Sequence, residues 1–108
     1  MKHHPFKSAH IRKAWLRKQL GQYGPFCWLC GYLLPDAFGL SEDGIWATTF
    51  DHVQTRADGG TSDYENLRLA HGKCNYRRNN RCVTTELIEH IHDLVPGNIR
   101  RLSSRLDQ

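Results

Sequence analysis

The amino-acid sequence predicts an α+β fold, in which two short strands and a helix form the centre and further helices flank it on both sides. Three observations support this prediction: two short runs of strand-forming residues, a polar helical segment directly after the second run, and amphipathic segments near both ends. The chain has 108 residues, which suits one small domain spanning residues 1–108. A domain of this size buries only about 60–70% of its unfolded surface, so we expect a stabilising cross-link.

The first predicted elements are a helix and a knuckle. Ser8 can cap a helix that runs through AHIRKAWLRKQL to about residue 21, with basic residues between the apolar ones. In the stretch GPFCWLCGYLL, residues 24–34, glycines bracket a C-x-x-C, which is typical of a tight knuckle. Residues 35–44 are expected to form a loop. The apolar residues of the helix, expected to pack as one stripe, are Ile11, Ala14 and Trp15.

The centre of the chain has the pattern of a β-hairpin followed by a helix. The run IWATTF at residues 45–50 is rich in β-branched and aromatic residues, so it predicts a strand that delivers the pair DH, residues 51–52, to its end. A turn at residues 58–60 and a second strand at residues 67–70 complete the hairpin. The polar segment HGKCNYRRNNR then predicts a helix that begins near His71.

The last predicted element is an amphipathic helix in the segment ELIEHIHDLV. Either Thr84 or Thr85 can cap its first turn, and Pro96 with Gly97 stops it. One face of this helix is apolar and is formed by Leu87, Ile88, Ile91, Leu94 and Val95.

Positive charge is distributed unevenly along the chain. The net charge is +4, and residues 1–35 contain six Lys and Arg without an acidic residue. Residues 66–85 are again basic and free of acids. Two such segments suit a polyanion, most simply the phosphates of nucleic acid, although solvated helix faces would have the same composition.

The N-terminal 21 residues are basic and amphipathic, unlike a signal peptide, and no apolar run approaches the roughly 20 residues that cross a bilayer. We therefore expect a soluble, cytoplasmic protein without membrane contact. In a reducing compartment, the four cysteines of a small chain more often bind metal than each other.

Two pairs of residues have the spacing of metal ligands. Cys27-x-x-Cys30 and His71-x-x-Cys74 are two arms of the kind that close a tetrahedral zinc site, with 40 residues between them. His71 and Cys74 stand three apart on the predicted helix, so both can face the knuckle. Cys82 is an alternative to His71 as fourth ligand, and buried free thiols are the other interpretation. The two arms favour one structural Zn²⁺.

Several motifs follow one another in a recognisable order: C-x-x-C, D-H-V, G-G, and N-L-R-L-A-H-G-K-C-N-x-x-R. Together they resemble the zinc-containing HNH nucleases, whose ββα-metal core runs C-x-x-C, D-H, a G-G turn, N-L, and C-x-x-C-[HN]-x-x-[KR]. The resemblance covers residues 27–81 and is strongest to the small stand-alone HNH proteins of phages and bacteria. Three positions depart from the usual motif: His71 replaces a cysteine, Asn75 a histidine and Thr55 a proline.

The resemblance implies a metal-dependent endonuclease that hydrolyses DNA phosphodiester bonds. Asp51 and Asn75 offer the hard oxygen ligands that suit Mg²⁺ or Mn²⁺, and His52 is the natural general base. Adjacent residues of a regular strand point to opposite faces, so we expect the strand to end or bulge at Asp51 and His52.

By analogy with the family, Asn66 is expected to tie the loop and orient the ring of His52, a catalytic role, although a plain turn cap explains this residue equally well. Four basic residues in the segment HGKCNYRRNNR, which contains the proposed ligands His71 and Cys74, are expected to contact DNA. One of them, Arg78, occupies the basic position of the motif. The four are Lys73, Arg77, Arg78 and Arg81.

Two other functions compete with nuclease activity. A zinc-stabilised nucleic-acid-binding module without catalysis would have no need of Asp51 and His52 beside Asn75. A protein-binding zinc knuckle would leave the two basic segments unexplained. We expect DNA as the partner in the cytoplasm of a bacterial or phage-infected cell, with phage packaging proteins as further candidates. No pattern in the sequence specifies an oligomeric state.

Overall fold

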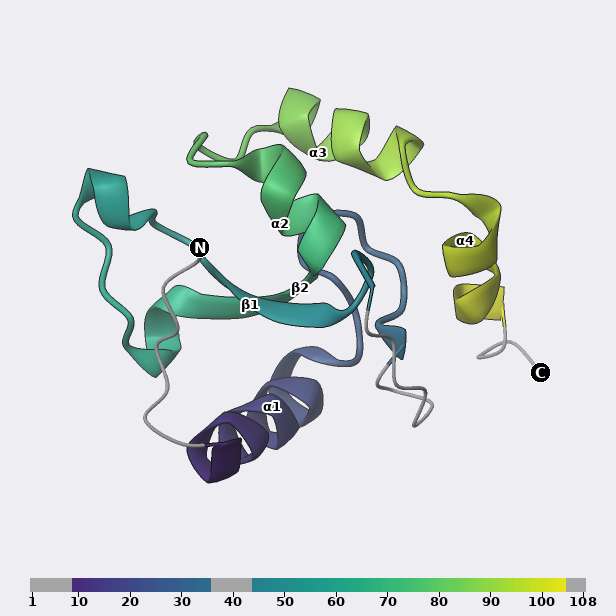
Figure 1. Ribbon diagram of the computed structural model, residues 1–108. Coiled ribbons are helices and arrows are strands. Elements are labelled where there is room, and N and C mark those ends of the chain that lie inside the picture. The colour runs from purple at the N-terminus through teal and green to yellow at the C-terminus, as the bar shows by residue number, and fades with distance from the viewer. Residues whose placement is uncertain (1–8, 36–43, 105–108) are drawn as a thin grey trace.

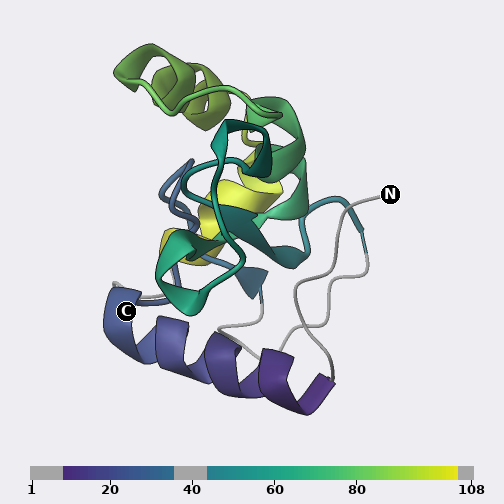
Figure 2. The same ribbon diagram turned by 90° about the vertical axis from the view of Figure 1, so that its left-hand side faces the viewer.

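The computed structural model describes residues 9–35 and 44–104 and places a two-stranded hairpin between helices. Helix α1 covers one face of the hairpin, α2 covers the other, and α3 lies against α2 (Figure 1). A view from the side has the same order of layers (Figure 2). The elements are α1 (Ala9–Tyr23), β1 (Thr48–His52), η2 (Arg56–Asp58), η3 (Tyr64–Asn66), β2 (Leu67–His71), α2 (Gly72–Arg78), α3 (Thr85–Asp93) and α4 (Gly97–Ser104).

This architecture confirms the predicted α+β fold, with a ββα centre flanked by helices. Strands β1 and β2 pair antiparallel, with Thr48 opposite His71 at one end and His52 opposite Leu67 at the other. The expected helix cap Ser8, and residues 36–43 of the expected loop, lie outside the described residues.

Strand β1 begins three residues later than the pattern IWATTF predicts. The carbonyl oxygens of Ile45 and Ala47 accept hydrogen bonds from the backbone nitrogens of Lys73 and Gly72, at 2.5 and 2.8 Å. These donors belong to the first turn of α2 and have no partner inside the helix. The segment before β1 therefore serves as a backbone cap for α2 instead of extending the strand.

Helix α1 packs against the core through Leu16 and Leu20 and not through the expected stripe, and polar contacts add to this packing. Of the three stripe residues only Trp15 is partly buried. Gln19 is buried instead, and its side-chain nitrogen donates to the carbonyl oxygen of Leu67 at 2.6 Å. Arg12 donates to the carbonyl oxygen of Thr48 at 3.2 Å, so this arginine is not fully solvated.

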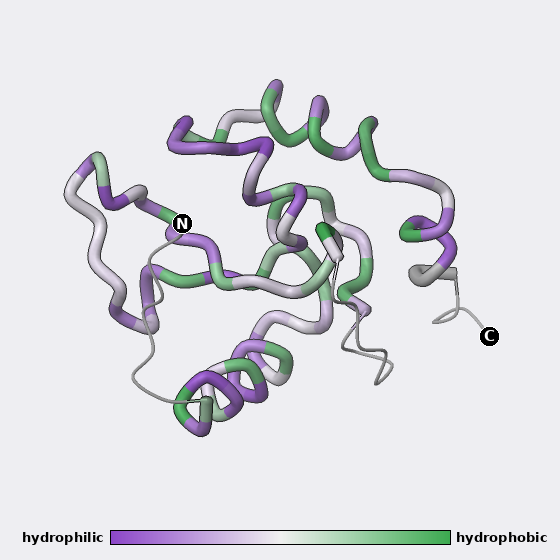
Figure 3. The backbone as a smooth tube through the Cα atoms, in the orientation of Figure 1, coloured by the Kyte–Doolittle hydropathy of each residue, from purple (hydrophilic) through white to green (hydrophobic). Residues whose placement is uncertain are grey.

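The C-terminal helices close the other side of the core. As predicted, Thr84 caps α3, and its hydroxyl accepts a hydrogen bond from the backbone nitrogen of Leu87 at 3.2 Å. In Figure 3, α3 alternates between hydrophobic and hydrophilic residues, whereas the end of α2 and the start of the following loop, residues 77–81, are continuously hydrophilic. Helix α4 is an element that the sequence patterns did not predict. Within the described residues, no helix has the length and apolar character needed to span a membrane.

Candidate metal centre and active site

Three cysteines and one histidine meet in the interior of the molecule. The ligand atoms of Cys27, Cys30, His71 and Cys74 all lie within 4.8 Å of one another, and all four residues are buried. The knuckle supplies two of them, and the junction of β2 and α2 supplies the others. The structure thus brings together the four side chains predicted as zinc ligands, whereas the alternative ligand Cys82 is exposed and outside the group.

The backbone of the knuckle fixes the positions of two sulfur atoms. The nitrogen of Gly31 donates to the carbonyl oxygen of Cys27 at 2.8 Å, and Gly31 has φ +81°, a conformation that glycine adopts without strain. The backbone nitrogens of Cys30 and Tyr32 lie 3.5 Å from the sulfurs of Cys27 and Cys30, respectively. Hydrogen bonds of this kind stabilise thiolates.

The ring of His71 is oriented by a backbone carbonyl. Its Nε2 lies 3.0 Å from the carbonyl oxygen of Leu33, which can only accept a hydrogen bond, so Nε2 carries the proton. Nδ1 therefore carries the lone pair, and it lies 3.4 Å from the sulfur of Cys30 and 3.7 Å from that of Cys74. A second partner that fixes the tautomer in this way is typical of metal-binding histidines.

The acidities of the three buried thiols depend on one another. Burial raises the pKa of the Cys27 thiol, but hydrogen bonds from Cys30, Cys74 and His71 outweigh it, so the net shift is downward. Hydrogen bonding to Cys27 raises the pKa of the Cys30 thiol to about 12, and the same interaction raises the pKa of Cys74. The protein groups alone favour a single thiolate, and a divalent cation would allow all three to ionise. Four buried sulfur and nitrogen donors fit Zn²⁺.

A second candidate site is an open hollow of about 330 Å³ between β1, the loop after it and α2. Asp51 and His52 line it from β1, and Asn75 lines it from α2. The predicted base His52 and the predicted metal ligands Asp51 and Asn75 therefore face one space, whereas Asn66, the other residue expected to act in catalysis, is not among those that line it. The remaining lining residues are mostly polar and include Thr55, Arg56, Asn79 and Asn80.

Strand β1 ends at His52, in agreement with the expected strand end, and no bulge is present at Asp51 and His52. Both residues pair regularly, with Arg68 and Leu67 of β2. Among the described residues the sheet has only two strands, so β2 covers one edge of β1 and leaves the other edge uncovered by sheet. Side chains from both faces of an edge strand can border a space along that edge, which is why no bulge is needed.

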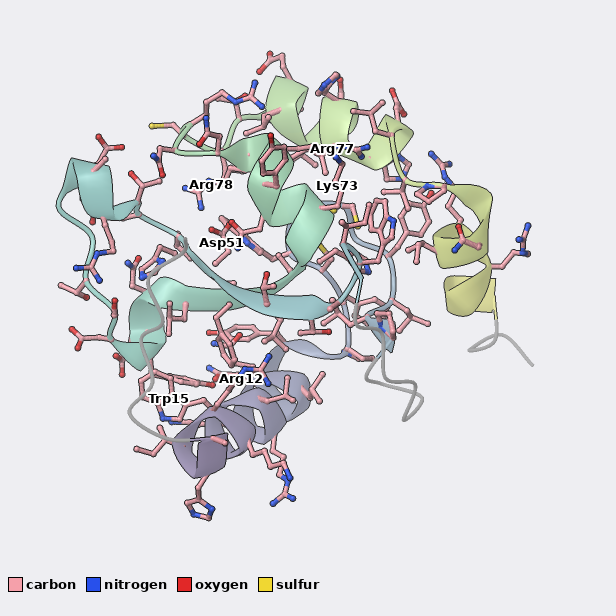
Figure 4. The ribbon with its side chains drawn as sticks, viewed as in Figure 1. Arg12, Trp15, Asp51, Lys73, Arg77 and Arg78 are labelled. Carbon is pink, nitrogen blue, oxygen red and sulfur yellow. The ribbon has the colours of Figure 1, made fainter. Side chains whose placement is uncertain are left out.

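Asp51 is held by two donors from different elements. Its Oδ2 accepts hydrogen bonds from Nη1 of Arg78 at 2.9 Å and from Nε1 of Trp28 at 3.1 Å. Figure 4 shows Arg78 reaching from α2 toward Asp51 on the hairpin. Arg78 also donates to the carbonyl oxygens of His52 and Val53. The end of β1 is therefore fastened to both the knuckle and the ligand helix.

This burial changes the interpretation of Arg78. The expectation was a contact with DNA phosphates, but the residue is only 2% exposed and its guanidinium is engaged inside the protein. Its guanidinium group binds the end of the hairpin and is not presented at the surface. A phosphate contact by Arg78 is incompatible with this arrangement.

The other basic residues are more accessible but not free of internal contacts. Lys73 is half-buried beside the ring of Tyr76, and Arg77 donates from Nη1 to the carbonyl oxygen of Leu94 at 3.2 Å. Arg81 is exposed, and its guanidinium bonds to carbonyl oxygens at the end of α2. Lys73 and Arg77 lie on α2 in Figure 4, and with Arg81 they remain candidates for contact with DNA.

His52 has a partner that the sequence patterns did not reveal. Its Nε2 lies 3.1 Å from the hydroxyl oxygen of Ser62, and Nη1 of Arg56 donates to the same oxygen at 3.2 Å. Ser62 precedes Asp63, the residue at the N-terminal end of the turn η3. Ser62 lies ten residues from His52, and only the folded loop brings them together.

Asn66 fastens the base of the β1–β2 loop. Its Oδ1 accepts from the backbone nitrogen of Gln54 at 2.9 Å, and its Nδ2 donates to the carbonyl oxygens of Gln54 and Thr61 at 3.0 and 2.7 Å. The expected role in tying the loop therefore agrees with these contacts. The bond to the ring of His52, however, comes from Ser62 and not from Asn66.

A hairpin and helix that share a buried Cys₃His cluster and present an aspartate, a histidine and an asparagine to one hollow form the arrangement of the zinc-containing ββα-metal class. The sequence model described as HNH endonuclease matches residues 27–81, just over half of the chain. The chain therefore belongs to the HNH endonuclease family. Searches of curated proteins and of solved structures gave no match.

Proposed function

We propose that this protein is a metal-dependent endonuclease that hydrolyses phosphodiester bonds of DNA in the hollow between β1 and α2. The observation that carries the proposal is that Asp51, His52 and Asn75 line the same hollow. Hydrolysis of a phosphodiester needs a base and oxygen ligands for a cation, and these side chains can supply both. A zinc-stabilised module that only binds nucleic acid would need none of the three.

Asp51 and Asn75 are the residues that would hold Mg²⁺ or Mn²⁺. When bound, the ion would polarise the scissile phosphate and stabilise charge on the leaving oxygen. Arg78 and Trp28 both contact Oδ2 of Asp51, which fixes the carboxylate. The side-chain nitrogen of Asn75 lies 3.3 Å from the Thr49 hydroxyl, which leaves its amide oxygen as the atom suited to a hard cation.

His52 is proposed as the general base that takes a proton from the attacking water. This role needs the tautomer in which Nε2 carries the proton and donates to Ser62, because Nδ1 then carries the lone pair. The hydroxyl oxygen of Ser62 has two lone pairs, so it can accept from both Arg56 and His52. Ser62 thus acts as a positioning residue for the ring.

The proposed Zn²⁺ of the Cys₃His cluster has a structural role, distinct from that of the catalytic ion. All four of its ligands are buried protein side chains, so they would complete a tetrahedral site with no position for substrate. The cluster joins the knuckle to β2 and α2; Asn75 lies on α2, and Asp51 lies on β1, which pairs with β2.

The test is a nicking assay on supercoiled plasmid with zinc-loaded protein, in which Mg²⁺ or Mn²⁺ is varied. We expect His52→Ala to lose activity by about 10²–10⁴-fold at every metal concentration, the range of a general base. Asp51→Ala should recover part of its activity at high metal concentration, because it loses a ligand and not the base. His90→Ala, an exposed histidine of α3, is the matched control and should remain active.

Zinc content and circular dichroism must be unchanged in each variant for this comparison. Parental protein that fails to nick DNA with any divalent ion would overturn the proposed activity. Rescue of His52→Ala by metal would instead remove the assignment of His52 as base.

A further inference from the structure

A second hollow lies on the surface of α2, next to the proposed active site. It has a volume of about 400 Å³ and is lined by Ile45, Thr49, Gly72, Lys73 and Tyr76. Tyr76 is 71% exposed and Ile45 is 60% exposed, the highest values for large hydrophobic residues in the described part of the chain. An aromatic ring and an aliphatic side chain are therefore presented to solvent around one concave surface, which we call the α2 hollow.

The α2 hollow is continuous with the proposed active site. Tyr76 lines both hollows and directly follows Asn75 in α2. Thr49 lines the α2 hollow, and its hydroxyl lies 3.3 Å from the side-chain nitrogen of Asn75. A DNA strand whose phosphate is held at Asn75 therefore places the adjoining nucleotide beside Tyr76.

The floor of the α2 hollow is rigid. The carbonyl oxygen of Ile45 accepts a hydrogen bond from the backbone nitrogen of Lys73, which fixes Ile45 on the first turn of α2. A Cβ atom on Gly72 would lie 3.1 Å from the same carbonyl oxygen, so glycine permits this close approach. A preorganised surface loses less entropy when it binds a flat ligand.

We propose that the α2 hollow is a binding site for an unpaired nucleobase, with the ring of Tyr76 as its stacking surface. This inference rests on the proposed function and specifies its substrate class: DNA that has an unpaired nucleotide next to the cleaved phosphate. Inside a duplex both faces of each base are already stacked on its neighbours, so away from the duplex ends only an unpaired base can lie on Tyr76.

The charge around the α2 hollow favours a nucleotide over an apolar protein segment. Nζ of Lys73 lies over the Tyr76 ring, 5.2 Å from its centre, and none of the described residues that line the hollow is acidic. An aromatic ring beside a cation can bind a base and its phosphate together, which is the usual combination in sites for single-stranded nucleic acid. Lys73, the charged residue among the described lining residues, attracts the DNA backbone.

The experiment measures DNA binding without cleavage, in zinc-loaded protein that carries His52→Ala. Fluorescence anisotropy compares a labelled single-stranded oligonucleotide with a blunt duplex of the same sequence. Tyr76→Ala should weaken binding of the single strand about tenfold and binding of the duplex less than about twofold. Tyr76→Phe keeps the ring and should bind both DNAs like the parent. Tyr23→Ala is the matched control, because Tyr23 is an exposed tyrosine that lines neither hollow.

Equal effects of Tyr76→Ala on the two DNAs, or no effect on either, would overturn the inference. A change of oligomeric state in Tyr76→Ala, seen by light scattering without selective loss of single-strand binding, would identify the α2 hollow as a contact between copies and also overturn it. Plasmid nicking by protein with His52 intact tests the proposed function separately. Normal nicking with no selective effect of Tyr76→Ala would reject the base site and leave the nuclease activity standing.

Discussion

Replacing Arg78 by lysine tests whether this residue fastens the active site or contacts DNA. Arg78 donates to Oδ2 of Asp51, to the carbonyl oxygens of His52 and Val53, and from Nε to the carbonyl oxygen of Arg81. Lysine keeps the charge but has one nitrogen at the end of a flexible stem. It can keep a bond to Asp51, but it cannot also reproduce the separate bonds from Nη2 and Nε.

The expected magnitude follows from these lost contacts. Each buried hydrogen bond contributes about 0.5–1.5 kcal/mol net, so the loss of two lowers the free energy of unfolding by about 1–3 kcal/mol. Urea unfolding of zinc-loaded protein measures this change. Arg81→Lys is the matched control, because Arg81 is exposed, and it should change stability by less than about 0.5 kcal/mol. An unfolding midpoint of Arg78→Lys equal to that of the parent would refute the fastening role.

DNA binding gives an independent test of the same residue. Arg78→Met removes the charge, yet a buried cation that is paired with Asp51 releases no counterions from DNA. The slope of log affinity against log salt should therefore stay at the parental value in protein that circular dichroism shows to be folded. A slope reduced by about 0.9 would mean that Arg78 neutralises a phosphate after all.

Three further predictions concern the metal site, the histidine partner and the loop. The protein should contain one zinc per chain, retained in Cys82→Ser and lost in His71→Ala by elemental analysis, and zinc should dissociate as pH falls because protons compete for the thiolates. Ser62→Ala should lower kcat about tenfold and alter its pH profile, whereas Ser62→Thr should restore both, since it retains the hydroxyl. A Cβ atom at Gly60 would lie 1.9 Å from a carbonyl oxygen, so Gly60→Ala should disrupt the loop and lower the temperature of thermal unfolding. A Cβ atom at Gly59 would meet open space, so Gly59→Ala should lower that temperature only slightly, through the strain of its φ of +88°.

Sequence patterns predicted the parts of this protein that short-range chemistry determines. The spacing of Cys27-x-x-Cys30 and His71-x-x-Cys74 selected the same four residues that cluster in the structure. The cap at Thr84 and the second strand also followed from local preferences. In each case the signal lies within a few residues, either as a local contact or as a pair of metal-ligand residues at short spacing.

The sequence patterns did not predict contacts between segments that are distant along the chain. The burial of Arg78 depends on Asp51, 27 residues away, so its basic character alone suggested a surface role. Strand β1 is shorter than predicted because the carbonyl oxygen of Ile45 accepts a hydrogen bond from α2. The partner of His52 is Ser62, which only the folded loop brings close to it. Each of these positions has a hydrogen-bond donor or acceptor whose partner lies in a distant segment, so the bond forms only in the folded protein.

The hydrogen bond from Trp28 to Asp51 would link the proposed nuclease activity to the state of the cysteine cluster. Trp28 directly follows Cys27 in the chain, so the residue that donates a hydrogen bond to the proposed catalytic carboxylate is the neighbour of a proposed zinc ligand. Under the proposed mechanism, a chain that is newly synthesised, oxidised at its cysteines or starved of zinc lacks a properly held Asp51. Immature or damaged copies would then be poor nucleases, and the genome would be exposed to cutting only by chains that have completed their maturation.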